Sequence, residues 1–270
     1  VSTLTTKDAE VTILAMERGA IDFVTKPGNV IEAKGEDFKK QLLSVLTAVY
    51  NTQLYKRTTP DTFKPAGVAK HIRPVRTDRK LVALACSTGG PKALQSVIPY
   101  LPKNLDAPVV LVQHMPAGFT KSMADRLNEL SEVSVKEAEE GDVLEKGHVY
   151  VAPGGMHMEV VKAHGNTHRI KLDDLPPIGG LRPCANIMFD SLAKTDYDEI
   201  ICIVLTGMGA DGTNGILSLN RTKPIHVIAQ DAQTCVVYGM PRAIAEAGMV
   251  DEVVPLTAVA KTIIKNVGVK

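Results

Sequence analysis

The feature that most constrains the fold is a series of short apolar runs that begins at residue 81 and alternates with segments of helical periodicity. Several runs are continuous in Val, Ile and Leu, without the in–out alternation of a strand that has one face in water. Such strands are typical of a parallel sheet covered on both faces, and the segments between them supply crossover helices. The pattern predicts a doubly wound α/β domain with a mainly parallel sheet flanked by helices, a Rossmann-like arrangement.

The two periodicities also place the individual elements. The expected strands are 81–86, 109–113, 149–151, 158–161, 200–205 and 226–229. The expected helices are 92–100, 120–130, 185–194, 211–220, 241–247 and 256–267. Aromatic residues make up 4% of the chain and Trp is absent, so the core must be built from aliphatic side chains and Met.

The first fifty residues have a broken α/β pattern that is too short to close a core by itself. Their spacing predicts a helix over 11–18, a short strand over 21–25 and an amphipathic helix over 37–50. We interpret residues 1–50 as the C-terminal portion of a separate domain. The sequence starts with Val1 rather than Met, which fits a fragment of a longer protein.

Residues 51–79 lack apolar periodicity and contain three prolines, so they are predicted to be a linker to a domain that spans 80–270. From residue 51 to 80 there are eight basic and two acidic residues, whereas the whole chain has a net charge of +1. A solvated linker is the preferred interpretation, and docking on an acidic partner is the alternative. The near-neutral total argues against a dedicated nucleic-acid-binding protein.

Cysteine spacing and hydropathy exclude further classes. Cys86, Cys184, Cys202 and Cys235 are widely spaced with no CxxC pair, so we expect free thiols in a reducing compartment rather than disulfides or a zinc site. No apolar run reaches the ~18 residues of a membrane span, and no signal peptide is visible. We therefore expect a cytoplasmic protein without membrane insertion.

Three of the expected strands end in loops that carry reactive side chains. Ser87 follows the first strand in a Gly-containing turn, where it can act as a nucleophile or cap a helix, and the turn can hold a phosphate on its N–H groups. His114 follows the second strand. Asp211 lies in a glycine-rich loop after the strand at 200–205, and by itself it is more readily explained as a helix cap.

Together, these three residues match the roles of a hydrolytic triad. The carboxyl ends of parallel strands meet at one edge of the sheet, where ligands bind. A Ser hydroxyl needs a base, His has a suitable pKa, and a carboxylate orients the imidazole. The Ser–His–Asp order differs from the Ser–Asp–His order of α/β-hydrolases and the GxSxG motif is absent, so a chance grouping stays open.

Several separate motifs occur in one order along the chain: ACSTGG at 85–90, VQHMP at 112–116, VAPG at 151–154, GMGADG at 207–212, IAQD at 228–231 and CVVYGMP at 235–241. Together they resemble the CheB family of bacterial protein-glutamate methylesterases. The resemblance covers about residues 80–268 without large gaps. It implies hydrolysis of γ-glutamyl methyl esters on chemoreceptors to glutamate and methanol, with glutamine deamidation as a second activity, in chemotaxis adaptation.

The resemblance also assigns roles to residues by motif position. It implies Ser87 as nucleophile, His114 as base and Asp211 as orienting residue, with Thr88 and Met208 supporting the oxyanion site and the histidine. No metal ion and no organic cofactor are implied.

Three further positions near these motifs are less sharply assigned. Cys86 stands where the family usually has Ala, and we interpret it as a packed strand residue. Arg182 and His157 are expected either to line the substrate cleft or to be structural.

For residues 1–50 the resemblance implies the end of a flavodoxin-like receiver domain. Ser2 would be the hydroxyl residue that contacts a phosphoryl group, and Lys26 the Lys that follows the fifth strand of the receiver. In the family the unphosphorylated receiver packs over the catalytic cleft, and a partner kinase supplies the phosphoryl group. The phospho-accepting Asp lies upstream of these positions, outside this sequence.

We therefore predict that a phosphodonor does not alter the activity of this chain, because the acceptor carboxylate is missing. Esterase activity measured with and without acetyl phosphate should be equal. A several-fold stimulation by acetyl phosphate would contradict the prediction.

Two functions from other classes remain open at this point. A phosphate- or nucleotide-binding module would use the turn at 87–90, although both the GxGxxG and the GxxxxGK[ST] fingerprints are absent. A response-regulator fragment that acts only as an interaction module is the other alternative.

Overall fold

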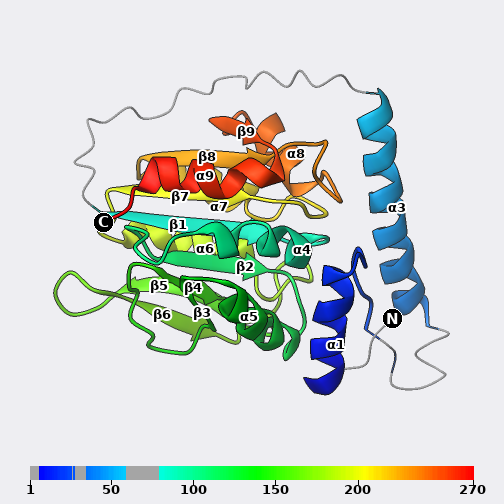
Figure 1. Cartoon of the computed structure of the whole chain (residues 1–270), viewed down its shortest axis with the longest axis horizontal. Helices are drawn as coiled ribbons and strands as arrows, with labels where there is room; N and C mark the ends of the chain where they lie inside the picture. Colours follow the sequence, from blue (N-terminus) through cyan, green and yellow to red (C-terminus); the bar gives the residue numbers. More distant parts are fainter. Residues whose placement is uncertain (1–5, 26, 28–34, 59–78) are drawn as a thin grey trace.

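The computed structural model of the protein describes residues 6–25, 27, 35–58 and 79–270. At its centre is a seven-stranded sheet in the order β3-β4-β2-β1-β7-β8-β9, and every neighbouring pair is parallel. A separate two-stranded hairpin, β5-β6, is antiparallel. The prediction of a doubly wound α/β fold with a mainly parallel sheet is confirmed (Figure 1).

The elements have the following bounds. The strands are β1 (Lys80–Cys86), β2 (Val109–Gln113), β3 (Ser134–Glu137), β4 (His148–Val151), β5 (His157–Lys162), β6 (His168–Asp173), β7 (Glu199–Val204), β8 (Ile225–Gln230) and β9 (Glu252–Val254). The helices are α1 (Thr6–Glu17), α3 (Glu36–Thr58), α4 (Gly90–Gln95), α5 (Phe119–Leu130), α6 (Ala185–Ser191), α7 (Thr213–Asn220), α8 (Met240–Glu246) and α9 (Leu256–Val267), with 3-10 turns η1 (Ile98–Tyr100) and η2 (Leu192–Lys194).

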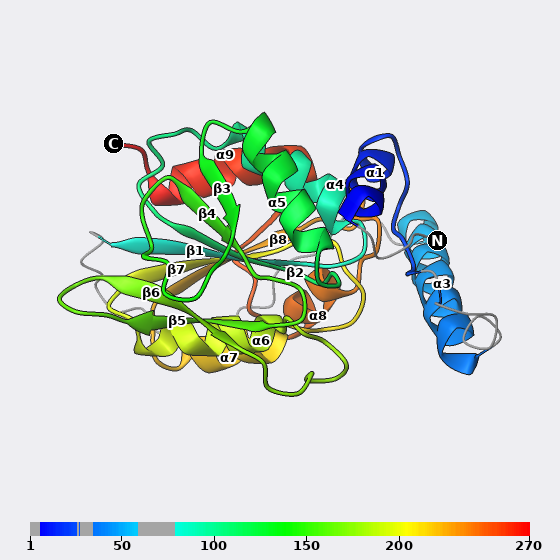
Figure 2. The same cartoon turned by 90° about the horizontal axis from the view of Figure 1, so that it is seen from below.

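The continuous apolar runs are explained by helices on both faces of the sheet. In β1, Val82 and Leu84 belong to one core cluster, whereas Leu81 and Ala83 belong to the other. The first cluster lies beneath α1, α4, α5 and α9, and the second lies beneath α6, α7, α8 and the β5-β6 hairpin (Figure 2). Because neither face meets water, no polar alternation is needed along the central strands.

The strand order places a topological switch point between β1 and β7. From β1 the chain moves outward through β2 to β4 and β3, and from β7 it moves the opposite way through β8 to β9. In open α/β sheets a ligand site forms at the carboxyl ends of the strands where the order reverses. The loops after β1, β2 and β7 therefore share that position.

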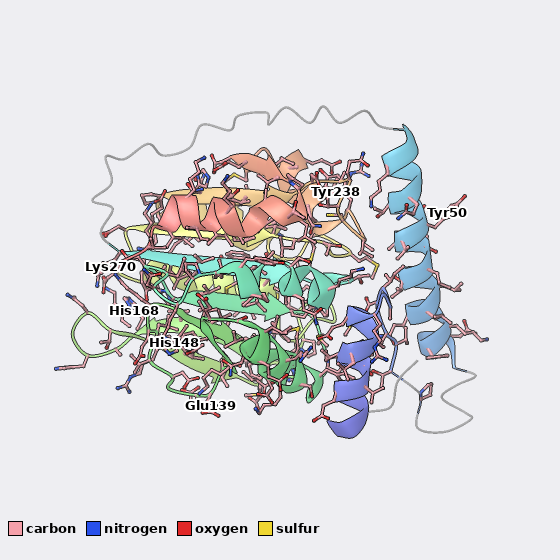
Figure 3. All side chains as sticks on the ribbon, in the orientation of Figure 1. Tyr50, Glu139, His148, His168, Tyr238 and Lys270 are labelled. Atoms are coloured by element: carbon pink, nitrogen blue, oxygen red, sulfur yellow. The ribbon has the colours of Figure 1, made fainter. Side chains whose placement is uncertain are left out.

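The N-terminal helices stand at the same carboxyl edge of the sheet (Figures 1 and 2). Glu17 at the end of α1 pairs with Arg126 of α5 at 2.6 Å. The ring of Phe23 stacks on that of Phe119 with centroids 4.5 Å apart. Tyr50 projects from α3 away from the sheet (Figure 3).

Several expected bounds differ from the structure. The strand predicted at 21–25 does not form: only Thr25 makes an isolated bridge, and Phe23 packs on α5 instead. The helix predicted at 37–50 is longer, because α3 continues to Thr58 into the predicted linker. The rest of that linker up to residue 78 lies outside the described residues, as do Ser2 and Lys26.

The expected elements from residue 81 onward are confirmed with small shifts. The helix predicted at 92–100 is divided into α4 and η1, and the one at 185–194 ends in η2. The strands β3, β6 and β9 were not predicted. None of the helices in the described ranges is long and apolar enough to cross a membrane.

Candidate active site

The turn after β1 presents Ser87 at the switch point. Gly89 adopts a left-handed conformation with φ of 77°, and α4 begins directly after it. The Ser87 N–H donates to Thr206 O at 3.0 Å, and the Gly90 N–H donates to Ser87 O at 2.7 Å. These two N–H groups already have protein acceptors, so a phosphate could use only the remaining N–H groups of the turn. The geometry therefore weakens the phosphate-binding alternative.

A buried amide joins this turn to the one that follows β2. Gln113 is 2% exposed, and its Nε2 donates to Ser87 O at 3.0 Å and to His114 O at 3.1 Å. Its Oε1 accepts the thiol of Cys86 at 3.0 Å. A Cβ at Gly90 would overlap Oε1, which explains why Gly stands there. Sequence reasoning missed Gln113, although it lies in the VQHMP motif beside His114.

His114 and Asp211 meet as an enclosed pair. Asp211 Oδ2 lies 2.8 Å from His114 Nε2, and the two side chains are 9% and 6% exposed. The same carboxylate accepts backbone N–H groups of Ala185 at 2.6 Å and Asn186 at 3.1 Å. The thiol of Cys184 donates to its Oδ1 at 3.2 Å. These donors surround Asp211 and fix its orientation toward the imidazole.

This environment keeps Asp211 ionised. Burial works against the charge, but the bonds from His114, the Ala185 N–H and Cys184 outweigh it and hold the pKa of Asp211 at about 2. An ionised carboxylate only accepts hydrogen bonds, so His114 Nε2 must carry the proton. The other ring nitrogen, Nδ1, is then an unprotonated acceptor in the neutral ring.

Asn186 is a second residue that sequence reasoning missed. Its side-chain Oδ1 accepts the N–H of Gly212 at 3.0 Å and of Gly215 at 2.8 Å. These bonds fasten the loop that carries Asp211 to the start of α6. No spacing pattern signals such a role, because the partners are backbone groups brought close only by the fold.

Ser87 and His114 open onto one cavity of about 370 Å³ at the carboxyl edge of the sheet. Thr88, Met208 and Arg182 also line it, so these five predicted site residues lie together. Among the described residues, no hydrogen bond joins Ser87 Oγ to the His114 ring. In such sites the nucleophile–base bond is often long before substrate binds.

His157 does not reach this cavity. Its ring is 1% exposed, with Nε2 3.3 Å from Pro176 O and no partner for Nδ1. It supports the segment that precedes Arg182. Arg182 itself lines the cavity while its Nη1 donates to Asp174 O at 2.7 Å and Leu175 O at 3.2 Å.

The N-terminal segment closes part of the cavity mouth. Asp22, together with Gln41, Ser44 and other residues of α3, lines the same space as Ser87. Burial raises the pKa of Asp22, against hydrogen bonds from the Thr88 side chain and the Phe23 N–H. The segment thus contributes part of the wall of the cavity that Ser87 lines.

The cysteines and metal-ligating side chains add no second reactive centre. All four thiols are buried and unpaired by disulfides, and burial raises the pKa of Cys86 far above its usual range. A buried thiol without a base stays protonated and is a poor nucleophile. Across the described residues, no group of three or more His, Cys, Asp or Glu side chains is placed to hold a metal ion.

The fold and cavity define a doubly wound α/β protein with Ser, His and Asp at the switch point of a parallel sheet. The family model described as CheB methylesterase matches residues 82–263. The chain belongs to this family.

Individual relatives agree with that membership over nearly the whole chain. A protein of Geobacillus kaustophilus named protein-glutamate methylesterase/protein-glutamine glutaminase is 41% identical over 268 residues, covering 99% of this chain and 76% of the relative. A protein of Bacillus subtilis with the same name is 41% identical over 97% of this chain and 75% of its own length. The crystal structure of the Thermotoga maritima CheB methylesterase catalytic domain is 44% identical, with a TM-score of 0.66, covering 69% of this chain and 98% of that domain.

The low pKa of Asp211 predicts a specific pH dependence of stability. The folded value of about 2 lies below the ordinary 3.8, so the stabilisation is present above about pH 4 and is lost as pH falls through 2. We expect Asp211→Asn to lower the free energy of unfolding by about 2 kcal/mol at neutral pH. Urea unfolding should show this difference shrinking toward pH 2.

The control is Asp125→Asn, which changes a carboxylate that is 55% exposed. Its effect should be small at every pH. A stability difference for Asp211→Asn that stays constant from pH 7 to pH 2 would contradict the prediction.

Proposed function

We propose that Ser87, His114 and Asp211 form the catalytic triad of a protein-glutamate methylesterase and protein-glutamine glutaminase. The observation that carries this proposal is the 2.8 Å bond between an ionised Asp211 and His114 in the cavity that Ser87 lines. The family and the names of the relatives give the activity. The chain hydrolyses γ-glutamyl methyl esters and deamidates glutamines in chemotaxis adaptation.

The geometry supports a two-stage acyl transfer. His114 Nδ1 takes the proton of Ser87 Oγ as this oxygen attacks the δ-carbonyl carbon of the substrate side chain. The imidazolium, stabilised by Asp211, then gives the proton to the departing methoxide or amine, so methanol or ammonia leaves. Water attacks the acyl-enzyme with the same base, which releases a glutamate side chain and restores Ser87.

The tetrahedral oxyanion needs N–H donors that are not already used. Within the described part of the chain, the Ser87 N–H donates to Thr206 O, whereas the N–H groups of Thr88 and Met208 have no recorded acceptor. We assign these two groups to the oxyanion site. A Cβ at Gly207 would overlap Met240 Sδ and lie 2.8 Å from Ser87 Cβ. Gly at this position therefore allows the loop after β7 to approach the turn after β1 closely.

The remaining assignments follow from the family. We assign residues 1–50 to a partial receiver domain, 51–79 to a linker and 80–270 to the catalytic domain. The CheB family acts on chemoreceptor glutamates, and the substrate here is the cytoplasmic helical region of methyl-accepting receptors. The enzyme is accordingly assigned to the cytoplasm. Arg182 offers a positive charge at the cavity wall to acidic side chains of such a receptor.

Replacing the nucleophile tests the triad directly. We expect Ser87→Ala to reduce methanol release by about 10³-fold or more with the fold intact, because the covalent step is lost. Cys86→Ala is the matched control one residue earlier. It should retain activity, because the family usually has Ala at this position and the two bonds from Gln113 Nε2 to Ser87 O and His114 O remain. Methanol release from a methylated receptor fragment measures both. Loss of activity in Cys86→Ala but not in Ser87→Ala would overturn the assignment.

Asn186 is expected to act through the position of Asp211. Removing the Oδ1 acceptor in Asn186→Ala frees the Asp211 loop, and we expect kcat to fall about ten- to a hundredfold with a changed pH profile. Asn186→Gln keeps an uncharged amide oxygen as acceptor and should restore part of the activity. Equal kcat values in the Ala and Gln variants would show that these two hydrogen bonds do not position the triad.

A further inference from the structure

We propose that the loop 174–182, between β6 and α6, is the docking surface for the protein substrate, whose helix lies against the apolar side chains of the loop. The inference rests on the proposed function and adds the residues that select a protein-borne ester over a small one. They are separate from the triad and from its supporting hydrogen bonds.

The loop exposes apolar side chains where a surface loop would ordinarily be polar. Leu175 is 59% exposed and Ile178 is 51% exposed, and Pro176 and Pro177 between them are exposed as well. Exposed apolar side chains concentrated in one short segment beside a cleft are typical of an interaction site. The loop therefore has the composition of a contact surface.

The loop is also held in one conformation. Ile178 and Leu181 exchange N–H···O bonds of 3.1 and 3.0 Å across a turn formed by Gly179 and Gly180, which have φ values of 59° and 82°. Arg182 Nη1 donates to two carbonyls at the other end of the loop. A preformed surface loses less entropy on binding than a flexible one. Arg182 Nη1 and the buried His157 ring, whose Nε2 lies 3.3 Å from Pro176 O, thus fasten this loop.

The docking surface is continuous with the cavity. Gly180, Leu181 and Arg182 line the same space as Ser87 and His114. A substrate side chain that reaches Ser87 must leave the rest of its backbone at the cavity mouth, beside this loop. Residues next to the esterified glutamate therefore meet Leu175 and Ile178.

A helix is the occupant that the cavity mouth fits. Gln41, Ser44 and Val45 of α3 line the cavity, and their i, i+3, i+4 spacing places them on one helix face. The Ser44 hydroxyl lies 3.2 Å from Met208 Sδ, another residue of the cavity wall. One face of α3 thus lines the cavity mouth in this structure. The substrate helix would occupy this place when it binds.

The test compares two substrates with the same γ-glutamyl methyl ester, of which only one carries a protein helix that can contact the loop. One is a folded helical receptor fragment that carries γ-glutamyl methyl esters, and the other is the γ-methyl ester of N-acetylglutamate methylamide. For the double variant Leu175→Ser/Ile178→Ser we expect kcat/KM for the receptor fragment to fall about tenfold or more, through KM. Hydrolysis of the small ester should be unchanged.

The control is Leu130→Ser/Val269→Ser, which removes two aliphatic side chains that are 42% and 52% exposed and lie outside the loop 174–182. It should leave both activities unchanged. Equal kcat/KM values for the receptor fragment in the loop variant and the wild type would overturn the docking surface, while small-ester hydrolysis would still support the proposed function. A wild-type chain inactive on both esters would refute the proposed function itself.

If the double variant loses small-ester hydrolysis, the single variants Leu175→Ser and Ile178→Ser distinguish a role in docking from a role in the chemistry. A selective loss of receptor-fragment hydrolysis in either one supports docking. Loss of small-ester hydrolysis in both would overturn the proposal, because the loop would then serve the chemistry rather than recognition.

Discussion

The relative position of the two reacting turns depends on the buried side-chain amide of Gln113. The parallel register places Gln113 directly beside Cys86, so its amide reaches the turn after β1 as well as its own. A buried amide left without partners costs about 1–3 kcal/mol, so the two bonds from its Nε2 to Ser87 O and His114 O are strongly favoured to form. This requirement sets the separation of Ser87 and His114 through backbone carbonyls. Thr206 joins the loop after β7 to the turn after β1 in the same way, because its hydroxyl donates to Thr88 O at 3.0 Å.

The charge of Asp211 is stabilised by its hydrogen bond with His114 and by fixed backbone N–H groups. Asp211 receives backbone N–H groups from both α6 and its own loop, and Asn186 holds these two segments together. Such dipoles are preorganised by the fold and need no rearrangement when the imidazole becomes charged. The carboxylate can therefore stay ionised although it is almost completely buried.

The elements that could be predicted are those with a clear hydrophobic pattern along their own residues. The central strands β1, β2, β7 and β8 are continuous apolar runs, and α9 has the bounds that its periodicity predicts. The strands β3 and β9 were missed because a four- or three-residue edge strand has too few positions to show a period. The strand expected at 21–25 does not form among the described residues: Thr25 makes a single isolated bridge, and the ring of Phe23 stacks on Phe119 of α5.

The same division applies to the candidate site. Ser87, His114 and Asp211 follow strands, so the sheet edge that they share could be foreseen from the sequence. Gln113 and Asn186 could not be assigned, because their partners are backbone groups supplied by other turns. His157 was expected either to line the cleft or to be structural, and its buried ring contacts the loop 174–182 through Pro176 O.

The pairing of β1 with β7 has a consequence for the order in which the molecule becomes active. Lys80 pairs with Glu199, so the central contact of the sheet joins segments that are far apart in the chain. Non-local pairings form slowly, because a long loop must close before its contacts are gained. The cavity straddles this seam, and a chain still leaving the ribosome has no complete triad until the residues after β7 have emerged. Until then the chain lacks Asp211 and cannot hydrolyse glutamine side chains of other proteins.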